Sequence, residues 1–118
     1  MIVVRNLTKR YGDTKALDHV DFEFKESTVT AIMGENGAGK TTLLKICAGI
    51  ISFDSGSIHV DGYSLVKDPL IIRKNLGYLP EMPYMYNRLT GREFLIYIAS
   101  LRSMKQADQQ INQLAHLL

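Results

Sequence analysis

Residues 34–42 read GENGAGKTT, and this stretch constrains the fold more than any other part of the chain. It follows the apolar run TVTAIM at 28–33 and leads into a segment where Leu43, Leu44 and Cys47 recur at helical spacing. An apolar run without a polar face is typical of a strand buried in a parallel sheet. The pattern therefore predicts a buried strand at 28–33, a glycine-rich loop, and a helix from Lys40 to Ala48 that Gly49 ends.

The loop matches the pattern G-x-x-x-x-G-K-[ST] from Gly34 to Thr41. Glycines let successive backbone N–H groups point inward as a nest for an anion, and the start of the next helix adds positive charge. In such loops the lysine, here Lys40, reaches the terminal phosphates of a nucleotide, and the hydroxyl, here Thr41, binds Mg²⁺. Thr42 can donate its backbone N–H or hydroxyl to a phosphate. The alternative is a chance glycine-rich turn, which the flanking strand and helix patterns disfavour.

Short alternating segments around the loop predict an antiparallel β region, with strand candidates at 2–4, 19–25, 58–60 and 77–79. In the second of these, Val20, Phe22 and Phe24 alternate with charged residues, which is typical of a strand with one wet face. Asp61-Gly62 after the third candidate is typical of a hairpin turn. Pro80 stops the fourth, and residues 80–87 are expected to form a loop.

From Thr90 onward the pattern is helical. Thr90 and Glu93 have the spacing of a capping box, and Leu89 with Phe94 has that of a hydrophobic staple. Ser103 and Gln106 repeat the box more weakly, ahead of a second amphipathic helix with apolar residues Ile111, Leu114 and Leu118. The expected fold class is α/β: a P-loop NTPase-type core with an antiparallel β subdomain in residues 1–89, and an incomplete helical subdomain that begins at residue 90 and runs to 118.

Charge and composition exclude several classes of protein. The net charge is only +2, and because no segment forms a basic stripe, nucleic acid is not an expected partner. The single cysteine, Cys47, has no intrachain disulfide partner and no neighbours at metal-ligand spacing. The longest apolar run, Phe94–Ala99, is far short of the roughly 20 residues that a membrane span needs. We therefore expect a cytoplasmic protein whose action at a membrane would require another subunit.

Five ordered stretches, which together span essentially the whole chain, resemble the ATP-binding-cassette (ABC) ATPases. Each of five family features has a counterpart in this chain. The features are the phosphate loop with its helix, the opening strand with its aromatic residue, the hairpin, the Q-loop strand and the first helix of the helical subdomain. These counterparts are MGENGAGKTTLLKICAGI at 33–50, LTKRYG at 7–12, DSGSIHVDG at 54–62, LGYLPE at 76–81 and LTGREFLIYIASL at 89–101.

The resemblance implies an ATP-binding subunit of an ABC transporter, or part of one, that binds Mg-ATP to power transport through a polytopic membrane subunit. It also implies a head-to-tail dimer with a second ATPase subunit, on the cytoplasmic face of the membrane. Tyr11 stands where the family stacks a ring on adenine; the alternative is a tyrosine that packs on the sheet edge. The residues that would contact ATP are Tyr11, Gly34, Glu35, Asn36, Gly37, Ala38, Gly39, Lys40, Thr41 and Thr42.

Glu81 stands where the family usually has the Q-loop glutamine, which approaches Mg²⁺ and the attacking water. A carboxylate can also serve Mg²⁺ or its water shell, so Glu81 is a candidate for catalysis and, with Thr41, for metal binding. The alternative is a loop carboxylate without such a role. This segment and the helix after it are more similar to ABC exporters than to importers, so export is the expected direction.

Other family motifs are missing. Hydrolysis needs an aspartate after an apolar strand to hold Mg²⁺ and a residue that positions water. ISFD at 51–54 and IHVD at 58–61 are not apolar enough for that strand, and neither a Leu-Ser-Gly-Gly signature nor a switch histidine is found. The sequence therefore predicts a chain that stops inside the helical subdomain and binds ATP without turnover by itself. Two alternatives stay open: a non-catalytic nucleotide-binding fragment, and a soluble ABC ATPase that is not involved in transport.

Overall fold

The computed structural model describes residues 1–82, 86 and 88–115 and divides the chain into two compact units, Met1–Tyr78 and Leu79–Leu118. The division falls between Tyr78 and Leu79, inside the segment 77–79 that the sequence predicts as a strand. The subdomain boundary that we predict after residue 89 concerns the layout of a larger domain, and it stays a prediction.

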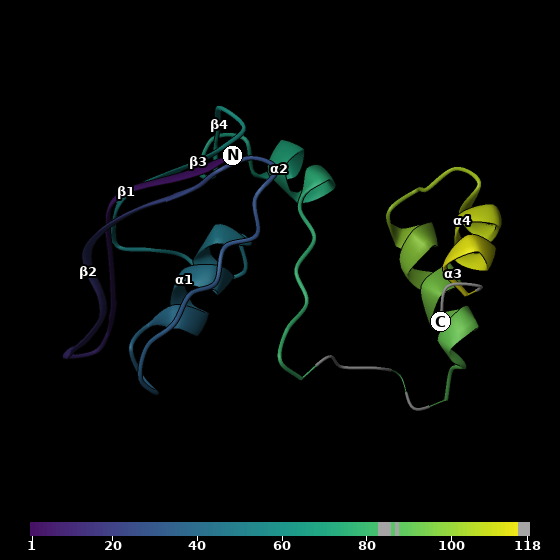
Figure 1. Ribbon diagram of the computed structural model, residues 1–118, viewed down its shortest axis with the longest axis horizontal. Coiled ribbons are helices and arrows are strands. Elements are labelled where there is room, and N and C mark those ends of the chain that lie inside the picture. The colour runs from purple at the N-terminus through teal and green to yellow at the C-terminus, as the bar shows by residue number, and fades with distance from the viewer. Residues whose placement is uncertain (83–85, 87, 116–118) are drawn as a thin grey trace. The chain divides into compact units, whose positions relative to one another are not determined.

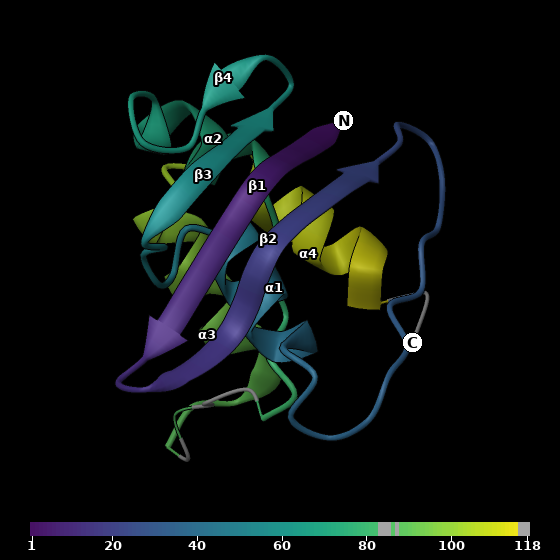
Figure 2. The same ribbon diagram turned by 90° about the vertical axis from the view of Figure 1, so that its left-hand side faces the viewer.

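The first unit is built on a four-stranded antiparallel sheet with the order β2-β1-β3-β4 (Figures 1 and 2). Gly12 and Asp13 join the first two strands, and a turn at Asp61-Gly62 joins the last two, with positive φ at both residues. Three of the four predicted strands are thereby confirmed, and all three are longer than predicted. The strands are β1 Ile2–Tyr11, β2 Thr14–Phe24, β3 Ser55–Val60 and β4 Tyr63–Ser64.

Bulges interrupt the pairing of β1 with β2. Asn6 and His19 each adopt a φ of 51° there, and side chains of the opposite strand satisfy their amides. The backbone N–H of Asn6 donates to Asp21 Oδ1 at 3.1 Å, and that of His19 donates to Thr8 Oγ1 at 3.2 Å. Because a bulge bends its strand and increases the local twist, the hairpin curves over the helix beneath it, as Figure 2 shows.

Helix α1, Lys40–Cys47, packs its apolar side against this sheet. Leu43, Ile46 and Cys47 are buried in one core with side chains of β1, β2 and β3, and the predicted inward set Val20, Phe22 and Phe24 packs against the same core. Burial raises the pKa of the Cys47 thiol to about 11, so the thiol stays protonated at neutral pH. Cys47 is therefore a core residue of the sheet–helix layer.

The predicted end of α1 is confirmed. Gly49 has a φ of 67° and donates to the carbonyl of Ile46 at 2.8 Å, while the N–H of Ile50 donates to the carbonyl of Lys45 at 2.9 Å. This pair of bonds is a Schellman motif, and it places the glycine where a left-handed backbone is needed.

Two predicted strands are wrong. Residues 28–33 and 77–79 form no strand, and they pair with none of the described strands. Val29 and Met33 are 103% and 87% exposed, and only Ile32 of this run packs against the core. The apolar pattern at 28–33 indicates that these side chains favour burial. A strand also needs a neighbouring strand whose N–H and C=O groups pair with its own, and the pattern does not indicate such a neighbour.

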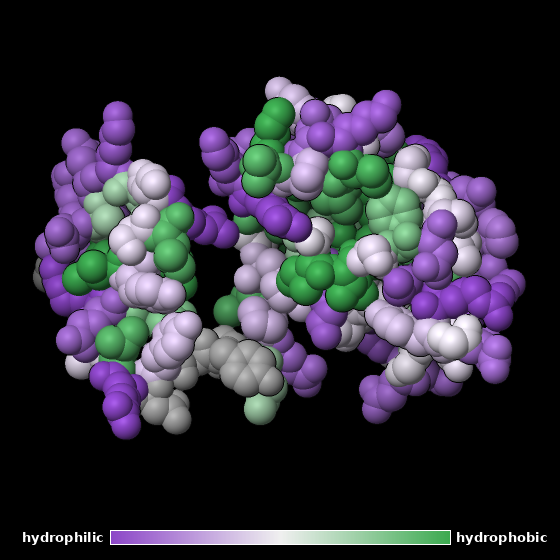
Figure 3. Space-filling model, turned by 180° about the vertical axis from the view of Figure 1, so that it is seen from behind, coloured by the Kyte–Doolittle hydropathy of each residue, from purple (hydrophilic) through white to green (hydrophobic). Residues whose placement is uncertain are grey.

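Apolar side chains accordingly reach the surface of the first unit as a group, which Figure 3 shows as a broad green area. Large apolar residues of this unit that are at least about two-fifths exposed are Met1, Tyr11, Val29, Met33, Leu44, Ile50, Tyr63, Val66, Leu70 and Ile71.

A short helix that the sequence patterns do not predict, α2, spans Pro69–Asn75, and its Ile72 is buried. Asp68 stands at its N-cap and its carboxylate accepts a hydrogen bond from the N–H of Ser64 at 3.1 Å. Asp68 followed by proline at the first helical position is a known start signal. The signal lies in the segment before the strand predicted at 77–79, where the sequence patterns above predict no helix.

The second unit is a pair of helices, α3 Gly91–Leu101 and α4 Ala107–Ala115, that contact each other. The predicted capping box at Thr90 and Glu93 is confirmed, with both reciprocal bonds present. The weaker box at Ser103 and Gln106 is wrong in part, because both residues have positive φ and α4 begins only after Gln106. Ile111 is buried and Leu114 exposed, while the predicted contribution of Leu118 lies outside the described residues. Among the described residues, no helix is long and apolar enough to cross a membrane.

The capping box predicts a pH dependence for α3. The Thr90 N–H and hydroxyl donate to the Glu93 carboxylate at 2.8 and 2.7 Å and lower its pKa below the ordinary 4.5. A depressed pKa in the folded state means that the stabilisation is complete above about pH 4.5 and is lost as pH falls through the folded value. We expect helix content, followed by circular dichroism, to decrease on acidification in this range. Glu93→Gln removes the titrating group, so an identical acid profile for this variant would contradict the expectation.

Candidate functional site

The predicted phosphate loop forms a tight turn that leads directly into α1. The N–H of Ala38 donates to the carbonyl of Glu35 at 3.2 Å, and Gly37 and Gly39 both adopt a φ of 85°. Gly39 is the N-cap of α1, and as a glycine it has no side chain that could cap the amides of the first helical turn. These amides are therefore available to an acceptor from outside the helix.

Gly39 fixes the end of the loop to the sheet. A Cβ at this position would lie 2.3 Å from the carbonyl oxygen of Ala16 and 2.9 Å from Leu17 Cδ2, both in β2. Only a residue without a side chain can approach a neighbouring backbone this closely while its own φ is positive. The start of α1 is consequently held against β2.

Lys40 bends back over the loop. Its Nζ donates to the carbonyl oxygens of Gly34 at 2.8 Å and Glu35 at 2.7 Å. An ammonium group has three donors, so the side chain can hold the two ends of the turn together and still offer a donor and its charge. The loop thus carries a positive charge beside its backbone amides.

The other predicted loop residues lie on the surface beside Lys40. Glu35, Asn36 and Thr41 are exposed, and Thr42 is half-buried in the first turn of α1. A Cβ on Gly37 would meet no atom within 4 Å, so this side of the loop is open to a ligand. Backbone amides, an ammonium group and two hydroxyls are the donors that a polyphosphate with Mg²⁺ requires, and the loop therefore fits such a ligand. The ATP and metal contacts of these residues stay predictions.

Tyr11 ends β1 in the same unit. It pairs with Thr14 across the hairpin, two residues before Ala16, whose carbonyl meets Gly39. The residue is 52% exposed, and the ammonium of Lys9 lies over its ring at 5.3 Å from the ring centroid. Lys9 is not among the predicted site residues, although residues separated by one position share a face in a regular strand, and this spacing could have indicated it.

Glu81 belongs to the second unit, where it stands at an exposed bend. The first unit holds every other predicted site residue. The proposed roles of Glu81 in catalysis and metal binding therefore stay predictions.

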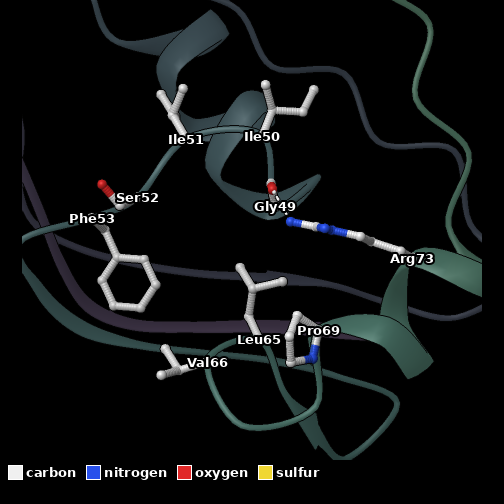
Figure 4. Close-up of a pocket in the computed structure, with 9 residues that line it drawn as sticks. All are labelled: Gly49, Ile50, Ile51, Ser52, Phe53, Leu65, Val66, Pro69 and Arg73. Carbon is white, nitrogen blue, oxygen red and sulfur yellow. Dashed lines mark hydrogen bonds between the residues drawn. The ribbon is translucent and has the colours of Figure 1, made fainter.

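A cavity of the first unit lies away from the phosphate loop. It has a volume of about 510 Å³ and lies beyond the opposite end of α1, between the segment Gly49–Phe53 and the start of α2 (Figure 4). Its lining is mostly apolar, and its single charged side chain, Arg73, donates to the carbonyl of Gly49 at 3.1 Å. Arg73 thereby caps the last turn of α1, which is a sufficient structural role.

Curated proteins that resemble the chain are ATP-binding proteins of ABC transporters. An uncharacterized ABC transporter ATP-binding protein, YhaQ of Bacillus subtilis (strain 168), is 34% identical over 92% of this chain and 35% of its own length. The bacitracin transport ATP-binding protein BcrA of Bacillus licheniformis is 36% identical over 86% and 33%. The sulfate/thiosulfate import ATP-binding protein CysA of Mycobacterium bovis is 36% identical over 91% and 30%. The chain thus spans about a third of the length of these relatives.

Solved structures agree with this fold. One described as the ATP binding subunit of an ABC transporter has a TM-score of 0.81 and 31% identity, covering 93% of this chain and 46% of its own. A dimeric bacterial ABC transporter cassette has a TM-score of 0.76 and 28% identity, covering 86% and 48%. The α/β assignment with an incomplete domain is therefore confirmed. The model of the family described as ABC transporter matches residues 17–118, and the chain accordingly belongs to the ABC transporter family of ATP-binding proteins.

Proposed function

We propose that the chain is the nucleotide-binding part of an ABC transporter subunit and that it binds Mg-ATP through residues 34–42. The observation that carries the proposal is the loop itself: two glycines at a φ of 85°, uncapped amides at the start of α1, and the Lys40 ammonium beside them. Thr41 would ligate Mg²⁺, and Tyr11 would stack on the base. Bound ATP would supply the free energy for transport through a membrane subunit.

The decisive experiment is a calorimetric titration of the purified 118-residue protein with ATP, with and without Mg²⁺. We expect one saturable site per chain, with binding that ADP or inorganic tripolyphosphate displaces. A protein that is folded by circular dichroism and gives no heat of binding with ATP would contradict the proposal.

The partners and the direction of transport are finer proposals. We infer a polytopic membrane subunit and a second ATPase subunit as partners, at the cytoplasmic face of a membrane, and export as the direction. The export proposal rests on the similarity of the segments at 76–81 and 89–101 to exporters. A relative named for sulfate/thiosulfate import is equally similar overall, so transport assays in vesicles with the cognate membrane subunit decide the direction.

Tyr11→Ala tests the stacking role. Stacking of a base on an aromatic side chain contributes about 1–3 kcal/mol, so the variant should bind ATP and GTP about fivefold or more weakly. Because every base has a π-face, the loss should be similar for both nucleotides. Tyr11→Phe keeps the ring and serves as the matched control, measured by the same titration. If Tyr11→Ala bound both nucleotides as tightly as the wild type, the ring would be only a sheet-edge residue.

Glu81→Gln tests the metal role. A carboxylate near the γ-phosphate repels it unless Mg²⁺ lies between the two, so the amide should leave Mg²⁺-free ATP binding unchanged or slightly tighter. The benefit of adding Mg²⁺ should be smaller in the variant. The measurement is the ratio of ATP dissociation constants with and without Mg²⁺. A ratio equal to that of the wild type would favour the alternative, a loop carboxylate without metal contact.

A further inference from the structure

We propose that Lys9 is a positioning residue for the Tyr11 ring, which it holds from one face so that the opposite face receives the base. The inference rests on the proposed nucleotide binding and adds a residue to which no role has been assigned. Lys9 would act through the ring of Tyr11 and would not touch the nucleotide.

The first observation is the contact between the two side chains. Lys9 and Tyr11 are separated by one residue in β1, the spacing that places two side chains on one face of a regular strand, and their contact shows that they share a face here. The ammonium of Lys9 lies over the Tyr11 ring at 5.3 Å from its centroid, within the range of a cation–π interaction. One face of the ring is thereby occupied, while 52% of the Tyr11 surface remains exposed.

The second observation is that Lys9 is itself held in place. Its side chain is only 12% exposed, which is unusual for lysine, and its Nζ lies 3.8 Å from Asp54 Oδ1. The same carboxylate accepts the backbone N–H of Arg10 at 2.6 Å, and the N–H of Asp54 donates to the carbonyl of Thr8 at 3.0 Å. Asp54 is thus fixed to β1 by backbone bonds, and it sets the position of the ammonium.

In the absence of nucleotide, Lys9 would already hold the Tyr11 ring in the orientation that binds the base. A side chain held in its binding orientation loses less conformational freedom when the ligand arrives. The cation also draws π-electron density toward its own face, which makes the far face a better partner for an electron-rich purine. Lys9 should therefore increase the contribution of the base to affinity and leave the contribution of the phosphates unchanged.

The test compares Mg-ATP with Mg-tripolyphosphate, which lacks the base. For Lys9→Met we expect the affinity for ATP to fall about threefold. The loss of binding free energy for tripolyphosphate should be less than half of the loss for ATP. Lys9→Arg keeps the cation and should retain most of the wild-type preference for ATP. Lys15→Met removes one charge from the neighbouring strand and should leave the ratio of the two affinities unchanged. If Lys9→Met has a lower melting temperature, Lys9→Gln, which is also uncharged, replaces it.

A double-mutant cycle separates positioning from a general effect of charge. In a Tyr11→Ala background, Lys9→Met should no longer alter ATP affinity, because there is no ring to position. Equal losses for ATP and tripolyphosphate, or the same loss with and without Tyr11, would overturn the inference and leave the nucleotide site intact. Absence of ATP binding by the wild type would overturn the proposed function as well, so the two failures are distinguishable.

Discussion

Replacing Lys40 with alanine is expected to lower the affinity for Mg-ATP by roughly tenfold or more, as measured by titration calorimetry. A charge-assisted hydrogen bond to phosphate contributes about 1.5–3 kcal/mol, and each 1.4 kcal/mol is about tenfold in affinity. The structure adds a second reason for a large effect. Lys40 also bonds the carbonyls of Gly34 and Glu35, so its removal leaves the turn without the contact that joins its ends.

The matched control for this variant is Lys45→Ala. Lys45 lies in the last turn of the same helix, so this change removes an equal charge at the end of α1 away from the loop. Its effect on ATP affinity should be less than about twofold, because a lysine about one and a half turns further along the helix makes no direct contact with the phosphates and its charge is partly screened by salt. Equal affinities for wild type and Lys40→Ala would refute the assignment of the phosphate loop. Equal losses for Lys40→Ala and Lys45→Ala would attribute the effect to net charge.

Gly39→Ala is expected to destabilise the first unit by about 2–4 kcal/mol in urea unfolding. Part of this cost is the left-handed backbone, which is unfavourable for any residue with a Cβ by roughly 1–2 kcal/mol. The rest is steric, since the added Cβ would lie 2.3 Å from the carbonyl oxygen of Ala16 and the helix start would have to move away from β2.

Gly37→Ala is the matched control, because Gly37 has the same φ of 85° but no atom within 4 Å of a built Cβ. This variant should lose only the backbone contribution, about 1–2 kcal/mol. The difference between the two variants therefore measures the contact of the loop with β2. If both variants were destabilised equally, the close approach of Gly39 to Ala16 would make no contribution to the free energy of unfolding.

The predictions that succeeded rest on local chemistry. The capping box at Thr90, the left-handed Gly49 and the turn at Asp61-Gly62 each act within a few residues, so the sequence contains all the participants. Residues 28–33 failed for the opposite reason. Their pattern describes a buried strand, but the existence of a strand depends on pairing with a partner elsewhere in the chain, and residues 28–33 pair with none of β1 to β4.

The same distinction between local and long-range chemistry applies to the candidate site. The phosphate loop could be predicted because its glycines, Lys40 and Thr41 are consecutive. The contact of Gly39 with Ala16 joins residues far apart in the chain, and no periodicity indicates it. The position of Lys9 could be predicted in part. Its spacing from Tyr11 along the strand is visible in the sequence, but its proximity to Asp54 arises only when the chain folds.

The central place of β1 has a consequence for the order in which the chain assembles. β1 and β2 are joined by a short turn and can pair as soon as both have been synthesised, whereas β3 must close a long loop to reach the other edge of β1. The glycine-rich turn and α1 lie inside that loop. The core against which α1 packs includes Ile58 and Val60 of β3, so during synthesis on a ribosome this core would be complete only after β3 has emerged. Nucleotide could then stabilise the finished unit, but it could not template the early hairpin.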